Sequence, residues 1–205
     1  MIRSLVPGLY YHIYNRGNNG DTLFYEPRNY RYFLQLFGRY IHPIVETYAY
    51  CLMPNHFHFL VQIRPLQDWQ SSLTQLQLER IQDCQPFVSH QFRNFFSTYT
   101  KAVNKAYNHT GSLFEKPFKR KVVDNERYFT TLITYIHRNP QTHGFVDDFR
   151  EWPWSSYQAL LTEKPTQVQR EAVLEWFGTR AALADAHLRD VDEGLIEPLI
   201  VDDWF

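Results

Sequence analysis

Residues 44–63 constrain the fold more than any other part of this sequence. Residues 44–53 and 55–63 are both rich in β-branched, aromatic and other apolar side chains, as is typical of strands. Pro54-Asn55, a turn-forming pair, stands between them. The pattern predicts two consecutive strands of a sheet that is buried on at least one side.

The second of these segments carries two histidines at strand spacing. Side chains alternate between the two faces of a strand, so His56 and His58 share one face while Phe57, Phe59 and Val61 point into the core. Their Cα atoms would lie roughly 6.6 Å apart, and two imidazoles that lean toward each other from that spacing can bind one metal ion. They are also compatible with two surface histidines that bind nothing. A divalent ion would need a further ligand from elsewhere in the fold.

The order of the remaining segments predicts the fold class. The pattern indicates a strand over 9–15, a helix over 27–40, a helix over 87–107, a short strand at Val122-Val123 and a helix from 126 to about 137 that ends at Asn139-Pro140. Strand, helix, strand, strand, helix, strand, helix is the order of a split βαβ fold. We therefore expect an α+β, ferredoxin-like sandwich with an antiparallel sheet. Residues 65–86 are polar and glutamine-rich and receive no assignment.

Residues beyond this core predict an added piece. Residues 166–188 have the apolar spacing of one further amphipathic helix. With 205 residues the chain is long enough for one full core and too short for two ordinary domains. We expect a catalytic domain over 1–160 and an acidic helical C-terminal extension over 161–205.

Composition narrows the cellular setting. No stretch of about 18 apolar residues and no apolar leader is visible, so neither a membrane span nor a secretory signal is expected. The two cysteines are too few for a disulfide framework or a zinc knuckle. A reducing, cytoplasmic location fits these features best.

Charge is distributed unevenly along the chain. Residues 147–205 contain 13 acidic and 5 basic side chains, whereas residues 1–146 contain 9 acidic and 16 basic ones. A basic body is compatible with nucleic-acid binding, although an ordinary solvated surface would look the same. Lys119 and Arg120, in the basic stretch 91–128, are the favoured phosphate contacts.

The helix predicted from residue 126 carries a second candidate pair. Tyr135 and Asn139 are four residues apart and share one helix face. A phenol can act as a nucleophile, and an amide oxygen is a hard ligand suited to Mg²⁺ or Mn²⁺. Taken alone, the pair fits a packing tyrosine and a helix-capping asparagine before Pro140 better than it fits a reactive site. By bare chemistry, other tyrosines would serve as well, namely Tyr107, Tyr128 and Tyr157.

Five stretches in this order resemble the single-tyrosine HUH transposases, especially the REP-associated tyrosine transposases. They are the opening strand and turn at 11–18, the metal strand at 49–58 with its His56-Phe57-His58 motif, the basic loop at 111–120, the catalytic helix end at 135–140 and the Trp-Pro-Trp turn at 152–157. Together these stretches span most of the chain.

The resemblance implies roles for particular residues. His56 and His58 would bind a divalent ion, Mg²⁺ or Mn²⁺, with Asn139 as third ligand, and Tyr135 would be the nucleophile. Arg16 would contact DNA together with Lys119 and Arg120.

The resemblance also implies a reaction and a partner. The expected activity is metal-dependent cleavage and strand transfer of single-stranded or hairpin DNA through a 5′-phosphotyrosine, by a monomer or a homodimer. Two alternatives remain open: a non-catalytic hairpin-binding protein on the same scaffold, and a metal-dependent phosphodiester hydrolase.

Overall fold

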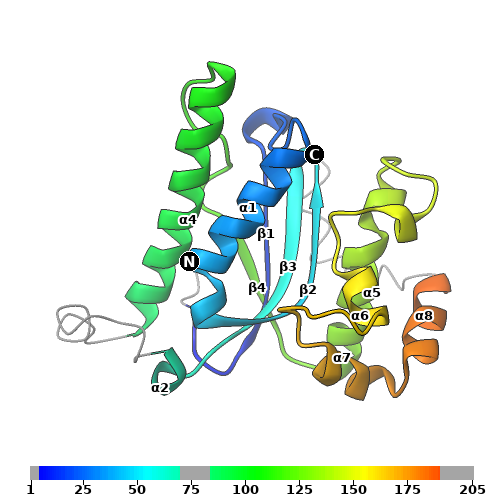
Figure 1. Cartoon of the computed structure of the whole chain (residues 1–205). Helices are drawn as coiled ribbons and strands as arrows, with labels where there is room; N and C mark the ends of the chain where they lie inside the picture. The colour runs from blue at the N-terminus through cyan, green and yellow to red at the C-terminus, as the bar shows by residue number, and fades with distance from the viewer. Residues whose placement is uncertain (1–4, 70–83, 190–205) are drawn as a thin grey trace.

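The computed structural model of the protein describes residues 5–69 and 84–189, which form a sheet with helices on both faces (Figure 1). The strands are β1 (Tyr10–Arg16), β2 (Val45–Met53), β3 (His56–Ile63) and β4 (Lys119–Val123). Their order in the sheet is β2-β3-β1-β4, and each neighbouring pair is antiparallel. This order arises when each of two βαβ units encloses a strand of the other. The predicted α+β ferredoxin-like fold is confirmed.

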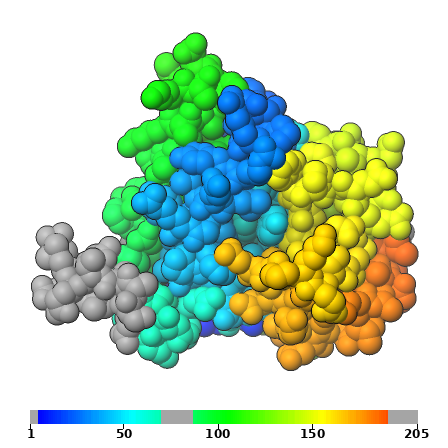
Figure 2. All heavy atoms as spheres, in the orientation of Figure 1, coloured from blue at the N-terminus to red at the C-terminus, as the bar shows by residue number. Residues whose placement is uncertain are grey.

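The helices form two layers. They are α1 (Pro27–Tyr40), α2 (Leu66–Trp69), α4 (Cys84–Tyr107), α5 (Glu126–Thr142), α6 (Tyr157–Leu161), α7 (Arg170–Phe177) and α8 (Arg180–Leu188). Helices α1 and α4 cover one face of the sheet, and α5 to α8 cover the other (Figures 1 and 2). None of the helices in the described ranges is long and apolar enough to cross a lipid bilayer.

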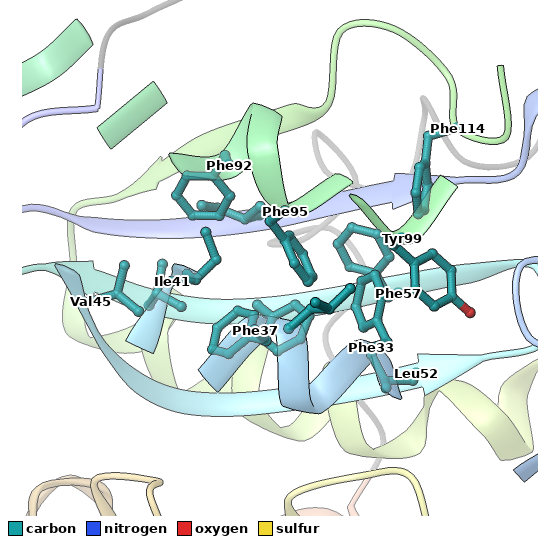
Figure 3. Close-up of a cluster of buried hydrophobic side chains, with 14 of the residues drawn as sticks. Phe33, Phe37, Ile41, Val45, Leu52, Phe57, Phe92, Phe95, Tyr99 and Phe114 are labelled. Atoms are coloured by element: carbon teal, nitrogen blue, oxygen red, sulfur yellow. The ribbon is translucent and has the colours of Figure 1, made fainter. Parts of the chain in front are cut away.

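An aromatic core fills the layer between α1, α4 and the sheet (Figure 3). The Phe33 ring on α1 lies 4.6 Å from the Phe95 ring on α4 and 5.3 Å from Phe57 on β3. Phe37 and Phe59 stack with their centroids 4.3 Å apart. The phenylalanines of β3 therefore point into this core, as the alternation predicts, and its two histidines point to the other face.

A second core attaches α5 to that other face. Leu132, Ile133 and Ile136 of α5 are fully buried, in one apolar cluster with Cys51 and Met53 of β2. The helix begins after Asn125, whose side chain accepts a hydrogen bond from the Tyr128 backbone N–H at 2.9 Å. Because its apolar stripe is held against β2, the opposite edge of α5 lies along β3 and its histidines.

The sequence predictions for two helical segments are wrong. α5 does not stop at Pro140 but continues to Thr142, because a proline in the last turn removes only one backbone N–H. Gly144, with a φ of 69°, follows the helix end. The single helix predicted over 166–188 is two helices. Gly178 (φ 84°) breaks it, and the Thr179 side chain caps α8.

Part of the predicted extension is described. Val168 forms a parallel bridge with Thr47 of β2, and α7 and α8 both contact α5. Residues 190–205 lie outside the described residues, as do 70–83 of the unassigned stretch. The boundary at residue 160 and the acidic character of the extension as a separate part stay predictions.

Candidate active site

The two histidines open strand β3, immediately after the Pro54-Asn55 turn. Their rings are 5.3 Å apart between centroids and nearly perpendicular, at 89°. His58 is almost fully buried, and His56 is partly buried. Both project toward α5, so the prediction that they share one face of the strand is confirmed.

Helix α5 brings the predicted tyrosine and asparagine to the same place. The Tyr135 ring meets the His58 ring edge-on, with centroids 5.6 Å apart. One turn later, Asn139 Oδ1 lies 3.2 Å from His56 Nε2. Asn139 is fully buried and Tyr135 is 8% exposed. Four of the predicted site residues, two from a strand and two from a helix, therefore form one cluster.

The hydrogen bonds of this cluster leave lone pairs facing one another. His56 Nδ1 lies 2.7 Å from Asn55 Oδ1, and because that oxygen can only accept, His56 Nδ1 carries the hydrogen. In a neutral imidazole His56 Nε2 is then an acceptor, and it faces the acceptor Oδ1 of Asn139. With the Asn139 amide turned over, its Nδ2 would instead donate to His56 Nε2. With Asn139 Oδ1 toward His56, two acceptor lone pairs face each other without a hydrogen between them. A cation bound between them would remove their mutual repulsion.

The donor set fits a hard divalent ion. His58 Nε2 is buried and has no hydrogen-bond partner among the described residues. Two imidazole nitrogens and an amide oxygen are ligands that Mg²⁺ or Mn²⁺ accepts. No three His, Cys, Asp or Glu side chains within 5–69 and 84–189 gather closely enough to hold a metal ion. A metal site here would therefore need the Asn139 amide.

Burial keeps the two histidines neutral. The pKa of His56 is lowered to about 3, chiefly by burial, with smaller contributions in the same direction from nearby His143 and Arg16. Burial also lowers the pKa of His58 well below its ordinary value. The neutral imidazole is the form that binds metals, so both rings have the charge state of a metal ligand near pH 7.

Two of the three predicted DNA contacts lie on the histidine face of the sheet. Arg16 pairs across the sheet with His56, and its guanidinium forms an ion pair with Glu115 at 2.5 Å. Lys119 pairs with Tyr14, which stacks near His58. Cross-strand partners point to the same face of a sheet.

The third predicted contact is elsewhere. Arg120 pairs with Ile13 and therefore points to the opposite face, where its guanidinium lies 4.8 Å from the Phe118 ring centroid. Strand alternation separates it from Lys119. The structure does not bring Arg120 to the cluster around Tyr135.

Two histidines that the sequence did not single out complete the surroundings. The His143 ring lies 4.7 Å from the His56 ring, and burial lowers its pKa to about 4. Its spacing of four from Asn139 would have revealed it, had the helix been predicted to continue past Pro140. His12 Nε2 lies 2.8 Å from His58 Nδ1, a contact that depends on β1 and β3 being neighbours.

A buried hydrogen-bond chain fixes the end of α5. His187 Nδ1 donates to the Leu183 carbonyl at 2.7 Å, so its Nε2 accepts from His137 Nδ1 at 2.8 Å. His137 Nε2 in turn accepts from the Ser156 hydroxyl at 2.7 Å, and Ser156 Oγ accepts the Tyr50 backbone N–H at 2.8 Å. Every member has a partner. The chain ties α8, α5 and β2 together two residues from Tyr135.

Known proteins of similar sequence and of similar structure share one description. A relative from Haemophilus influenzae described as "Putative REP-associated tyrosine transposase" is 27% identical over 115 residues, which is 55% of this chain and 58% of that protein. A solved structure of a REP-associated tyrosine transposase bound to a REP hairpin superposes with a TM-score of 0.58 at 17% identity, covering 80% of this chain and 87% of the other. No protein-family model matches the sequence.

The chain is similar in sequence and in fold to REP-associated tyrosine transposases. The resemblance carried by the five sequence stretches is thereby confirmed, and the architecture of the solved transposase is shared. The sequence match spans less than two thirds of the curated transposase, and the structural match shows the fold alone.

Proposed function

We propose that the protein is a transposase-type enzyme that cuts and rejoins single DNA strands through Tyr135, with Mg²⁺ or Mn²⁺ held by His56, His58 and Asn139. One observation carries this proposal. The phenol ring lies edge-on to His58 at 5.6 Å, on the same helix that brings an amide oxygen to 3.2 Å from His56 Nε2. The proposed nucleophile and the proposed metal ligands thus lie in one cluster.

The ligand set fits a cation because His56 Nε2 and Asn139 Oδ1 face one another at 3.2 Å, and His58 Nε2 is buried without a hydrogen-bond partner among the described residues. A bound divalent ion would draw negative charge from the scissile phosphate and favour the phenolate form of a nearby tyrosine. A free phenol has a pKa of about 10, so it is a poor nucleophile near neutral pH without such help.

Tyr135 would attack the phosphorus of a DNA strand. Its oxygen forms the new P–O bond while the bond from phosphorus to the 3′ oxygen of the preceding nucleotide breaks. The phenol loses its proton to solvent, and the leaving oxygen takes one up as a 3′-hydroxyl. The product is a 5′-phosphotyrosine, and a 3′-hydroxyl can reverse the step on a new strand because no bond energy has been lost to water.

The DNA substrate would be single-stranded or hairpin DNA. The related transposase of known structure holds a REP hairpin, which supports this substrate class. Arg16 and Lys119 lie on the face that carries the cluster, where they would contact phosphates. Tyr135 and the histidines come from one chain, which favours a complete site in a monomer; a homodimer is the alternative.

A covalent-adduct assay tests the proposal. The wild-type protein is incubated with Mn²⁺ or Mg²⁺ and a labelled hairpin oligonucleotide with single-stranded flanks, then run on a denaturing gel. We expect a protein–DNA adduct from wild type and from Tyr128→Phe, the matched control on the same helix. Tyr135→Phe is expected to bind the hairpin and form no adduct.

The alternatives give different results. A hydrolase would release cleaved DNA over many turnovers and leave no adduct, and a non-catalytic binding protein would shift the hairpin without cleaving it. Either result from the wild-type protein, or an adduct from Tyr135→Phe, would refute the proposed chemistry.

A further inference from the structure

A third histidine contacts the proposed metal ligands without being one of them. His12 of β1 is fully buried on the histidine face of the sheet, and its Nε2 lies 2.8 Å from His58 Nδ1. The two rings are within 16° of parallel. A hydrogen bond that joins nearly coplanar rings has good geometry for both nitrogens, so the contact is a true hydrogen bond rather than a packing accident.

A single hydrogen occupies this bond, and its position decides what His58 can bind. If it sits on His58 Nδ1, then His58 Nε2 has a free lone pair. If it sits on His12 Nε2, a neutral His58 carries its own hydrogen on Nε2 and cannot ligate a cation. His58 Nε2 and His12 Nδ1 are both buried without a partner among the described residues. Within 5–69 and 84–189, no other group therefore selects between the two forms.

We propose that His12 is the positioning residue for His58: it accepts the Nδ1–H and so directs the Nε2 lone pair to the divalent ion. The inference rests on the proposed function, because it concerns the same metal site. Metal-bound histidines characteristically donate their other ring N–H to such an acceptor, which fixes both tautomer and ring orientation.

Neighbouring residues fix the position of the His12 ring beside His58. The Tyr14 ring stacks on His12 at 4.6 Å between centroids and on His58 at 5.8 Å, so the three rings form one block. Across the sheet His12 is paired with Lys121, so its backbone position is fixed by β4 on one side and by β3 on the other.

Three variants of the full chain separate the roles. His12→Phe keeps an aromatic ring beside Tyr14 and removes the acceptor. His12→Gln supplies an amide oxygen that can accept the same hydrogen. His58→Ala removes the proposed ligand itself. Circular dichroism and thermal melting establish that each variant is folded before Mn²⁺ affinity is measured by calorimetry, without DNA.

We expect His12→Phe to weaken Mn²⁺ binding about 10- to 100-fold, the range for loss of an outer-sphere partner, and His12→Gln to restore most of it. His58→Ala should abolish binding at this site. Loss of binding in His58→Ala with unchanged binding in His12→Phe would overturn the role of His12 alone. Unchanged binding in His58→Ala would overturn the metal site of the proposed function, and the inference with it.

A spectroscopic readout separates positioning from packing. Long-range ¹H–¹⁵N spectra of the histidine rings, recorded with Mg²⁺, report which nitrogen of His58 carries hydrogen. We expect the Nδ1–H form in wild type and in His12→Gln, and a mixture of tautomers in His12→Phe. A His58 ring with hydrogen on Nε2 in the Mg²⁺-loaded wild type would contradict the assignment.

Discussion

Acid should unfold this protein well before its carboxylates titrate, because several histidines are buried in the neutral form. Burial lowers the pKa of His187 to about 4, and lowers the pKa of His12 and His56 to about 3. In the unfolded chain these groups titrate near about 6.5. Between the two pKa values the unfolded state binds more protons, so the free energy of unfolding falls as pH falls through this window.

The magnitude for His187 follows from its pKa. A shift from about 6.5 to about 4 corresponds to about 3 kcal/mol of stability that is present above pH 6.5 and lost by pH 4. His137, bonded to it, has a pKa lowered in the same direction. Small proteins have a total stability of about 5–15 kcal/mol, so a few such histidines suffice to unfold the chain.

Urea titrations at pH 7, 6 and 5, in the presence of a chelator, measure this loss. His187→Leu should be less stable than wild type at pH 7, because the buried His137 N–H loses its hydrogen-bond acceptor, yet its stability should depend less on pH. The slope should fall by roughly 1.4 kcal/mol per pH unit around pH 5. His90→Ala, at an exposed position, serves as control and should keep the wild-type slope. A wild-type stability that is constant from pH 7 to 5 would refute the reasoning.

Two further predictions concern the turn after β1 and the basic face. Gly17→Ala should destabilise the protein, because a Cβ there would lie 1.8 Å from the Asp21 carbonyl oxygen, whereas Gly38→Ala in α1 has room and should stabilise it by about 0.5–1 kcal/mol. Urea midpoints compare the two, and equal effects would contradict the account. Lys119→Ala should weaken hairpin binding and reduce the slope of log affinity against log salt by about one, measured by fluorescence anisotropy; an unchanged slope would remove Lys119 from the phosphate contacts.

The local sequence pattern was sufficient to predict the strands and helices and the faces on which their side chains lie. The alternation around His56 and His58 predicts both the buried phenylalanines and the shared histidine face, and the spacing of Tyr135 and Asn139 predicts their common edge of α5. Both predictions depend only on neighbours within about four residues. The order of the elements then predicts the sheet, because few topologies accommodate it.

The sequence pattern missed contacts between residues far apart in the chain. It also missed a helix that continues past a proline, and it overlooked the alternation of side chains along β4. His12 and His58 are 46 residues apart, and His137 and His187 are 50 apart, so neither pair has a sequence signature. Pro140 was expected to stop α5, which concealed the helical spacing between Asn139 and His143. Arg120 was grouped with Lys119 by charge, although adjacent strand residues point to opposite faces.

The proposed chemistry requires that Tyr135, and no other tyrosine, becomes bonded to DNA. The most direct measurement is mass spectrometry of the protease-digested adduct formed with Mn²⁺ and a hairpin oligonucleotide. Our account predicts a nucleotide attached through phosphate to the peptide that contains Tyr135, with fragment ions that assign the mass to that residue. Attachment to Tyr128 or to any other residue would contradict it.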